Sequence, residues 1–162
     1  MNQAHIGLTE KDLAGSGELL NQLLADQFLL YTKTLNFHWN VVGLQFHDLH
    51  KFLEHQYEDL FEMIDLVAER ARAMGVFSLG TMQEFSSKSQ LKEEPGLVPA
   101  SSAMIKRLLD DHETIIRSLR VALETAITKY HDAGTNNFLT DIMERHEKMA
   151  WMLRSFLQTA PN

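Results

Sequence analysis

Two pairs of side chains that can bind a metal lie within the stretch from residue 38 to residue 70. His50 and Glu54 form one pair, and Asp65 and Glu69 form the other. Residues four apart are neighbours on a helix surface, so either pair can hold a metal ion by an imidazole and a carboxylate or by two carboxylates. This ligand set suits iron, manganese or zinc better than copper(I). The two pairs therefore predict a metal site.

The segment that carries both pairs, residues 44–74, has the pattern of one long amphipathic helix. At 100° per residue, its apolar positions cluster on one arc: Leu49, Leu53, Leu60, Ile64, Val67 and Ala71. The four candidate ligands fall on an adjacent arc about 100° wide. They are therefore expected along the edge of the buried stripe, where helices meet.

The two pairs are too far apart to bind the same ion within one chain. Fifteen residues separate them, which is about 22 Å along a helix. If two copies of this helix packed antiparallel about a two-fold axis near Asp59 and Leu60, the first pair of each chain would meet the second pair of the other. We therefore expect a symmetric dimer with two identical sites, each of which takes ligands from both subunits.

The chain has 162 residues, which predicts a single domain over 1–162 with short tails at 1–8 and 158–162. Its apolar content of 44% and its three prolines favour a helical globular protein. It contains no cysteine. Any metal site must therefore use His, Asp, Glu, Met or backbone oxygen ligands.

The formal net charge of −7 argues against general nucleic-acid binding, which depends on Lys and Arg. The first basic residue of the chain is Lys11, near the start of the first predicted helix, and the last is Arg154. The start of the chain lacks the pattern of a signal peptide, and no window approaches the length of an apolar membrane span. We therefore expect a soluble cytoplasmic protein without membrane contact, and DNA binding is in doubt.

Apolar residues at three- and four-residue steps predict an all-α protein of four long helices. The first follows a capping box at Thr9 and Asp12 and runs to about Trp39. The other three are expected at 44–74, from 101 or 102 to 131, and from a cap at Thr135 onward. The irregular stretch 76–99, with one short helical turn at 82–85, is long enough to be a crossover. The result is a four-helix bundle with one long crossover between its second and third helices.

The sequence motifs resemble those of the Dps family of mini-ferritins. The first motif is His38-Trp39-Asn40-Val41-x-Gly43-x-x-Phe46-x-x-x-His50, followed by Asp65-x-x-Ala68-Glu69-Arg70. A second, His146-x-Lys148-x-x-Trp151, is similar to the last helix of that family. The resemblance covers essentially the whole chain and implies a ferritin-like bundle that assembles as a hollow homo-dodecamer.

The resemblance also implies an activity and a full set of site residues. A ferroxidase centre at the two-fold interface would use His38, His50 and Glu54 of one subunit with Asp65 and Glu69 of the partner subunit. These five residues would bind iron and carry the catalysis. The centre would oxidise Fe(II), preferably with hydrogen peroxide, and store ferric mineral in the cavity, which protects against oxidative damage. Zinc or manganese would be substitute metals.

Other interpretations of the same residues remain open. One alternative is a Dps protein that binds and protects DNA, and another is a structural bundle in which the His and carboxylate arc stabilises a dimer. A di-iron site inside one bundle, as in larger ferritins, is not expected, because no histidine has Glu three positions before it. The remaining histidines of the helices are expected to be structural or exposed: His47, His55, His112, His131 and His146.

Overall fold

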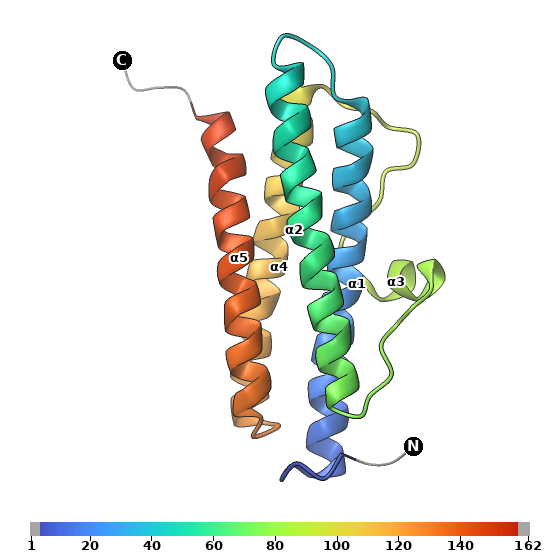
Figure 1. The fold of residues 1–162 in the computed structure, drawn as a ribbon, viewed down its shortest axis with the longest axis vertical. Coiled ribbons are helices and arrows are strands. Elements are labelled where there is room, and N and C mark those ends of the chain that lie inside the picture. Colours follow the sequence, from blue (N-terminus) through green and yellow to red (C-terminus); the bar gives the residue numbers. More distant parts are fainter. Residues whose placement is uncertain (1–3, 159–162) are drawn as a thin grey trace.

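The computed structural model describes residues 4–158, and it is all-α throughout that range (Figure 1). Four long helices form the bundle, and a short fifth helix lies on the connection between its halves. Their bounds are α1 Glu10–Asn40, α2 Phe46–Ala73, α3 Met82–Lys88, α4 Ser101–Thr128 and α5 Ala133–Leu157. None of these helices combines the length and apolar character that a membrane crossing needs.

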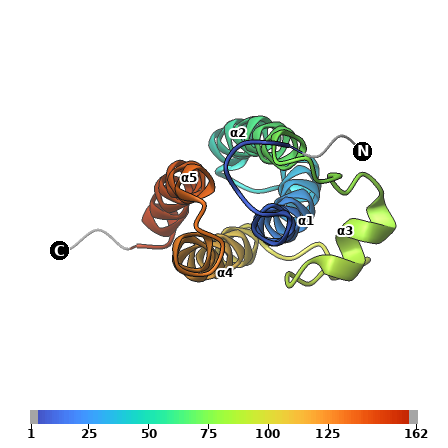
Figure 2. The ribbon, with the colours of Figure 1, turned by 90° about the horizontal axis from the view of Figure 1, so that it is seen from below.

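The long crossover sets the direction of the helices. α1 and α2 are antiparallel, and the connection after α2 returns along the side of the bundle, so α4 runs in the same direction as α2 (Figure 1). Seen from the end of the bundle, α1 lies between α2 and α4, while α5 closes the ring (Figure 2). The predicted four-helix bundle with one crossover is therefore confirmed. Helix α3 packs outside this ring, against α1.

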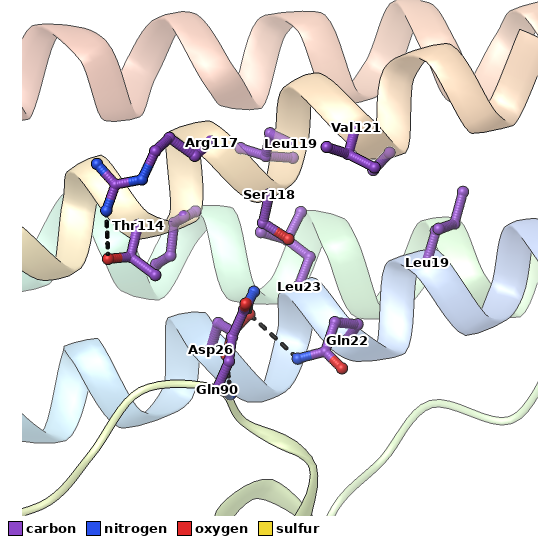
Figure 3. Close-up of a pocket in the computed structure, with 12 residues that line it drawn as sticks. Leu19, Gln22, Leu23, Asp26, Gln90, Thr114, Arg117, Ser118, Leu119 and Val121 are labelled. Atoms are coloured by element: carbon purple, nitrogen blue, oxygen red, sulfur yellow. Dashed lines mark hydrogen bonds between the residues drawn. The ribbon is translucent and has the colours of Figure 1, made fainter.

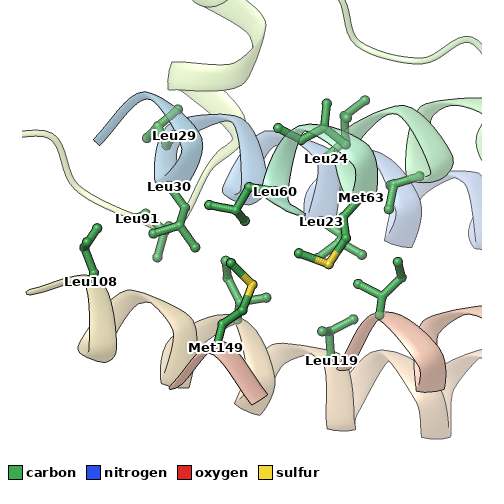
Figure 4. Packing of buried hydrophobic residues seen from close by; sticks show 14 of the residues in the cluster. Leu23, Leu24, Leu29, Leu30, Leu60, Met63, Leu91, Leu108, Leu119 and Met149 are labelled. Carbon is green, nitrogen blue, oxygen red and sulfur yellow. The ribbon is translucent and has the colours of Figure 1, made fainter. Parts of the chain in front are cut away.

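Leucine, isoleucine and methionine side chains from all four long helices fill the centre of the bundle (Figure 4). Leu24, Leu60 and Met63 are among the fully buried ones. Burial of each such side chain contributes about 1.5–3 kcal/mol. The apolar arc predicted on α2 is buried along its whole length. The candidate ligands of α2 therefore lie along the edge of this buried face.

Local sequence signals place most helix ends correctly. Thr9 and Asp12 form the expected capping box at the start of α1. Gly43 (φ 115°) and Gly75 (φ 79°) adopt the left-handed backbone that favours glycine, one after α1 and one after α2. The prediction that Thr135 caps the last helix is wrong. The N-cap is Asp132, whose carboxylate accepts a hydrogen bond from the Thr135 N–H, so the helix begins at residue 133.

Two other boundaries differ from the sequence-based expectation. Helix α4 ends at Thr128 rather than at about 131, because the chain turns there and His131 takes a positive φ of 54°. The single helical turn expected at 82–85 is a helix of seven residues. A capping box between Thr81 and Glu84 starts this helix, and burial of Phe85 holds it against α1.

Candidate metal centre

His38 and His50 meet at one end of the bundle, where α1 ends and α2 begins. The turn through Gly43 reverses the chain and brings together two residues twelve positions apart. Their imidazole rings stack with centroids 3.8 Å apart and an interplanar angle of 19°. His38 is buried and His50 is half-buried. The fold therefore brings together these two predicted site residues.

Two reciprocal hydrogen bonds hold the rings of His38 and His50. The His38 Nδ1–H donates to the carbonyl oxygen of His50 at 2.9 Å, and the His50 Nδ1–H donates to that of His38 at 3.0 Å. A carbonyl oxygen only accepts, so both Nδ1 atoms carry hydrogen and each neutral ring has its lone pair on Nε2. A hydrogen bond from one imidazole nitrogen to a carbonyl is the usual support for a histidine whose other nitrogen binds a metal.

The second of these hydrogen bonds also satisfies the end of α1. The carbonyl groups in the last turn of a helix lack partners within the helix, and that of His38 is one of them. His50 therefore stabilises the helix end with Nδ1 and keeps Nε2 for a ligand. The same contact fixes the orientation of both rings.

Glu54 lies one turn beyond His50 on α2. Its carboxylate accepts a hydrogen bond of 2.6 Å from Lys51 Nζ. This bond is the main reason why the pKa of Glu54 is below its usual value, and the nearby His38 and His50 act more weakly in the same direction. The carboxylate is therefore ionised at neutral pH. Lys51 is exposed, so it can move away when a cation arrives.

Aromatic rings flank the histidine pair on both sides. Phe46 stacks on His50 with centroids 5.1 Å apart, and Tyr57 meets His38 edge-on at 5.2 Å. Burial raises the pKa of Tyr57, and the charge of Glu54 adds to the effect. The phenol is therefore protonated at neutral pH. These rings restrict the motion of the imidazoles and shield one side of them from water.

Asp65 and Glu69 lie elsewhere on α2, and both are exposed. The structure does not bring them to the histidine pair: within residues 4–158 no three His, Asp or Glu side chains are close enough to hold a metal. Two large apolar side chains of α2 are also exposed: Phe61 (61%), between the two ligand pairs, and Leu66 (38%), within the second pair. Within a single chain the predicted ligands therefore lie in two separate groups.

A second histidine pair lies inside the bundle; its two members were expected to be structural or exposed, but their contact was not predicted. The Nδ1 atoms of His112 and His146 are 2.9 Å apart, and the Gln27 side-chain nitrogen is 3.0 Å from His146 Nε2. All three side chains are buried, and burial lowers the pKa of His146 to about 3. The signal was present in the spacing, because His112 and His146 occupy core-facing positions among apolar neighbours.

A groove of about 400 Å³ lies between α1 and α4, on a different part of the bundle (Figure 3). Its polar lining includes Asp26, whose carboxylate accepts hydrogen bonds from Ser89 Oγ, the Gln90 backbone N–H and the Gln22 side chain. These partners occupy the carboxylate and fix the crossover to α1. None of the predicted ligands lines the groove, so it is not the metal site.

Comparison with known proteins finds a family and relatives that cover most of the chain. Residues 17–162 match the family model of the ferritin-like domain. A low temperature-induced protein of Nostoc is 46% identical over 161 residues, which cover 99% of this chain and 90% of that protein. DNA protection during starvation protein 2 of Bacillus anthracis is 36% identical over 140 residues, covering 86% of this chain and 94% of that protein.

Solved structures show the same fold. The Dps protein of Vibrio cholerae O1 superposes with a TM-score of 0.89 at 28% identity, covering 98% of both chains. That protein is described as a member of a broad superfamily of ferritin-like diiron-carboxylate proteins. The likeness extends over the whole bundle and includes the end that carries His38 and His50.

Proposed function

The chain belongs to the Dps mini-ferritins of the ferritin-like family, and from this premise we propose that it oxidises Fe(II) with hydrogen peroxide and stores the ferric product in a hollow homo-dodecamer. The family assignment by itself supports a general role in iron storage and oxidative protection. The oxidant, the assembly and the residues that act are our proposal.

The observation that carries the proposal is the reciprocal hydrogen bonding of His38 and His50. It leaves the Nε2 lone pair of each ring free, and the ionised carboxylate of Glu54 lies one helical turn beyond His50. Neutral imidazole and carboxylate are ligands that suit ferrous iron. A pair of buried core histidines would not need to keep these nitrogens available.

The rest of the site comes from a second subunit in this proposal. Antiparallel packing of two α2 helices would bring Asp65 and Glu69 of the partner subunit to the histidine pair. The same packing would cover the exposed side chains of Phe61 and Leu66, which supports a symmetric interface along α2. The added carboxylates would balance the charge of two ferrous ions and the further charge gained on oxidation. Zinc or manganese would fit the same ligands.

Hydrogen peroxide takes up two electrons when it is reduced to water, and each ferrous ion gives one. A site that holds two ferrous ions therefore consumes peroxide without releasing a radical. This removes both reagents that produce hydroxyl radicals. The net charge of −7 favours this chemical protection over a coat on DNA.

The test begins with iron-free protein mixed anaerobically with ferrous iron, followed by hydrogen peroxide. We expect fast growth of ferric absorbance, with the product kept in a large soluble particle. In the double variant His38→Ala/His50→Ala the fast phase should disappear while the particle stays assembled. The matched control is His47→Ala/His55→Ala, which changes two exposed histidines of α2, the helix that carries His50. Full oxidation in the first variant would refute the site assignment.

A further inference from the structure

A run of aromatic rings leads from the histidine pair along the α1–α2 interface. Tyr57 meets His38 edge-on, with ring centroids 5.2 Å apart, and Tyr31 meets Tyr57 edge-on at 6.3 Å. Tyr31 in turn contacts Phe28 at 6.1 Å and Phe61 at 6.0 Å. Each ring of the run is therefore in contact with the next.

Only two members of this run are easily oxidised. A phenol loses an electron readily when its proton can leave, whereas the ring of phenylalanine resists oxidation. An oxidant formed at the histidine pair would therefore take its electron from Tyr57 or Tyr31. Trp39 adjoins His38 in sequence, but it is 68% exposed and has no ring contact with the pair among the described residues.

We propose that Tyr57, assisted by Tyr31, donates an electron to the iron site when the site holds a single ferrous ion. This inference rests on the proposed ferroxidase function and adds two residues to it. It assigns a redox role to side chains that are not metal ligands. Packing between α1 and α2 would place the rings side by side, and the redox role rests on the contact of Tyr57 with His38.

The chemistry of a half-filled site explains why a donor is needed. One ferrous ion gives one electron, so peroxide bound there would be cleaved to hydroxide and a free hydroxyl radical. With Tyr57 as the second donor, one ferrous ion, one hydrogen peroxide, one tyrosine and one proton give one ferric ion, one tyrosyl radical and two water molecules. The phenol proton and the proton from solvent both end in water.

The radical is then repaired by the substrate. A second ferrous ion gives one electron to the tyrosyl radical, which takes up one proton and returns to tyrosine. The sum of the two steps is the oxidation of two ferrous ions by one peroxide. Tyr31 would share the radical with Tyr57 and hold it between the two helices, where both rings are half-buried.

The chain offers a matched control, because it contains three tyrosines and the third, Tyr130, lies beside Gly15, away from this run. We would load the assembled protein with one ferrous ion per proposed site, add one equivalent of hydrogen peroxide, freeze the sample and record the electron paramagnetic resonance spectrum. The variants are Tyr57→Phe, Tyr31→Phe and Tyr130→Phe. Ring-deuterated tyrosine would assign the signal, and a spin trap would report escaped hydroxyl radical.

The wild type and Tyr130→Phe should show a tyrosyl radical whose signal narrows on ring deuteration. Tyr57→Phe should lose this signal and release more trapped hydroxyl radical, and Tyr31→Phe should show a changed or shorter-lived signal. Equal tyrosyl signals in the wild type and Tyr57→Phe would overturn the relay. If the wild type oxidises no iron at all, the proposed function fails instead, so the two failures are distinguishable.

Discussion

Two histidine pairs join antiparallel helices in this protein, and their ring nitrogens are used in opposite ways. In the pair at the end of the bundle, both Nδ1 atoms donate to backbone carbonyls and the rings stack. In the pair inside the bundle, the Nδ1 atoms of His112 and His146 contact each other at 2.9 Å. The Gln27 amide donates to His146 Nε2, so His146 donates through Nδ1 to His112.

The difference shows that the hydrogen-bond partners of a histidine decide which of its ring nitrogens stay available to a ligand. Backbone carbonyls fix the first pair in the tautomer that leaves Nε2 free. In the second pair, hydrogen bonds occupy both ring nitrogens of His146. Burial holds the pKa of both rings well below the usual value. The first pair is prepared for a ligand, whereas the second specifies how α1, α4 and α5 pack.

The largest expected effect comes from His146→Leu, which breaks the inner pair. Leucine removes both hydrogen bonds and leaves the Gln27 amide and the His112 ring without partners in the core. We expect a loss of about 2–4 kcal/mol in the free energy of unfolding, because each buried unpaired polar group costs about 1–3 kcal/mol. Urea denaturation at fixed protein concentration measures it. An unchanged midpoint would show that the inner pair has no structural role.

The matching change in the outer pair is His50→Leu. We expect oxidation of ferrous iron to slow at least ten- to hundred-fold, because loss of a proposed ligand should cost no less than loss of a ligand's hydrogen-bond partner, which costs about ten- to hundred-fold. Stability should fall by about 1 kcal/mol, because the change removes one hydrogen bond, the one to the carbonyl of His38 at a helix end. Stopped-flow absorbance and urea denaturation, run on both leucine variants, compare the pairs directly. Equal effects of the two variants on stability would remove the distinction.

Acid should weaken the fold through the inner pair. The folded-state pKa of His146 is about 3, below the usual value of 6.5, so the unfolded chain binds a proton that the folded chain excludes. Stability should therefore be independent of this group above pH 6.5 and fall as the pH drops from 6.5 to about 3. The slope is about 1.4 kcal/mol per pH unit for each such histidine.

The measurement is urea denaturation at several pH values for the wild type and for His112→Leu/His146→Leu. The double variant should show a shallower loss across this window. His47→Leu/His55→Leu removes two exposed histidines and serves as the control, with a slope like that of the wild type. A wild-type slope in the inner double variant would contradict the assignment of acid sensitivity to the core pair.

The smallest effect is expected from Lys51→Ala, next to the outer pair. Lys51 competes with a cation for the carboxylate of Glu54. Its loss should tighten ferrous binding by up to about five-fold, because an exposed ion pair is worth at most about 1 kcal/mol. Anaerobic titration calorimetry measures the change. Weaker binding in this variant would mean that Lys51 supports the site and does not compete for it.

Much of this structure follows from local sequence patterns. The pattern of residues 44–74 predicted the apolar arc of α2 and the edge that carries the proposed ligands, because helical periodicity fixes the angles between residues. The Thr9 capping box and the glycine turns follow from local backbone chemistry. The separation of Asp65 from His50 also followed from helix rise alone, and the structure keeps these residues apart as expected.

What the sequence did not reveal depends on contacts between distant residues. Thr135 and Asp132 are both good N-cap residues, and the choice between them depends on the buried position of Asp132 beside Arg70. The contact between His112 and His146 spans 34 positions, so it exists only after α4 and α5 pack. The reciprocal bonding of His38 and His50 likewise requires the folded turn between them.

The central claim is that each metal site takes ligands from two subunits, and mixed assembly tests it most directly. One inactive chain carries His38→Ala/His50→Ala, and the other carries Asp65→Asn/Glu69→Gln. In a mixed dimer one site receives both defects and the other receives none. Co-assembly of equal amounts should therefore restore about a quarter of the wild-type oxidation if pairing is random. If the mixture is as inactive as each parent, the shared site is wrong.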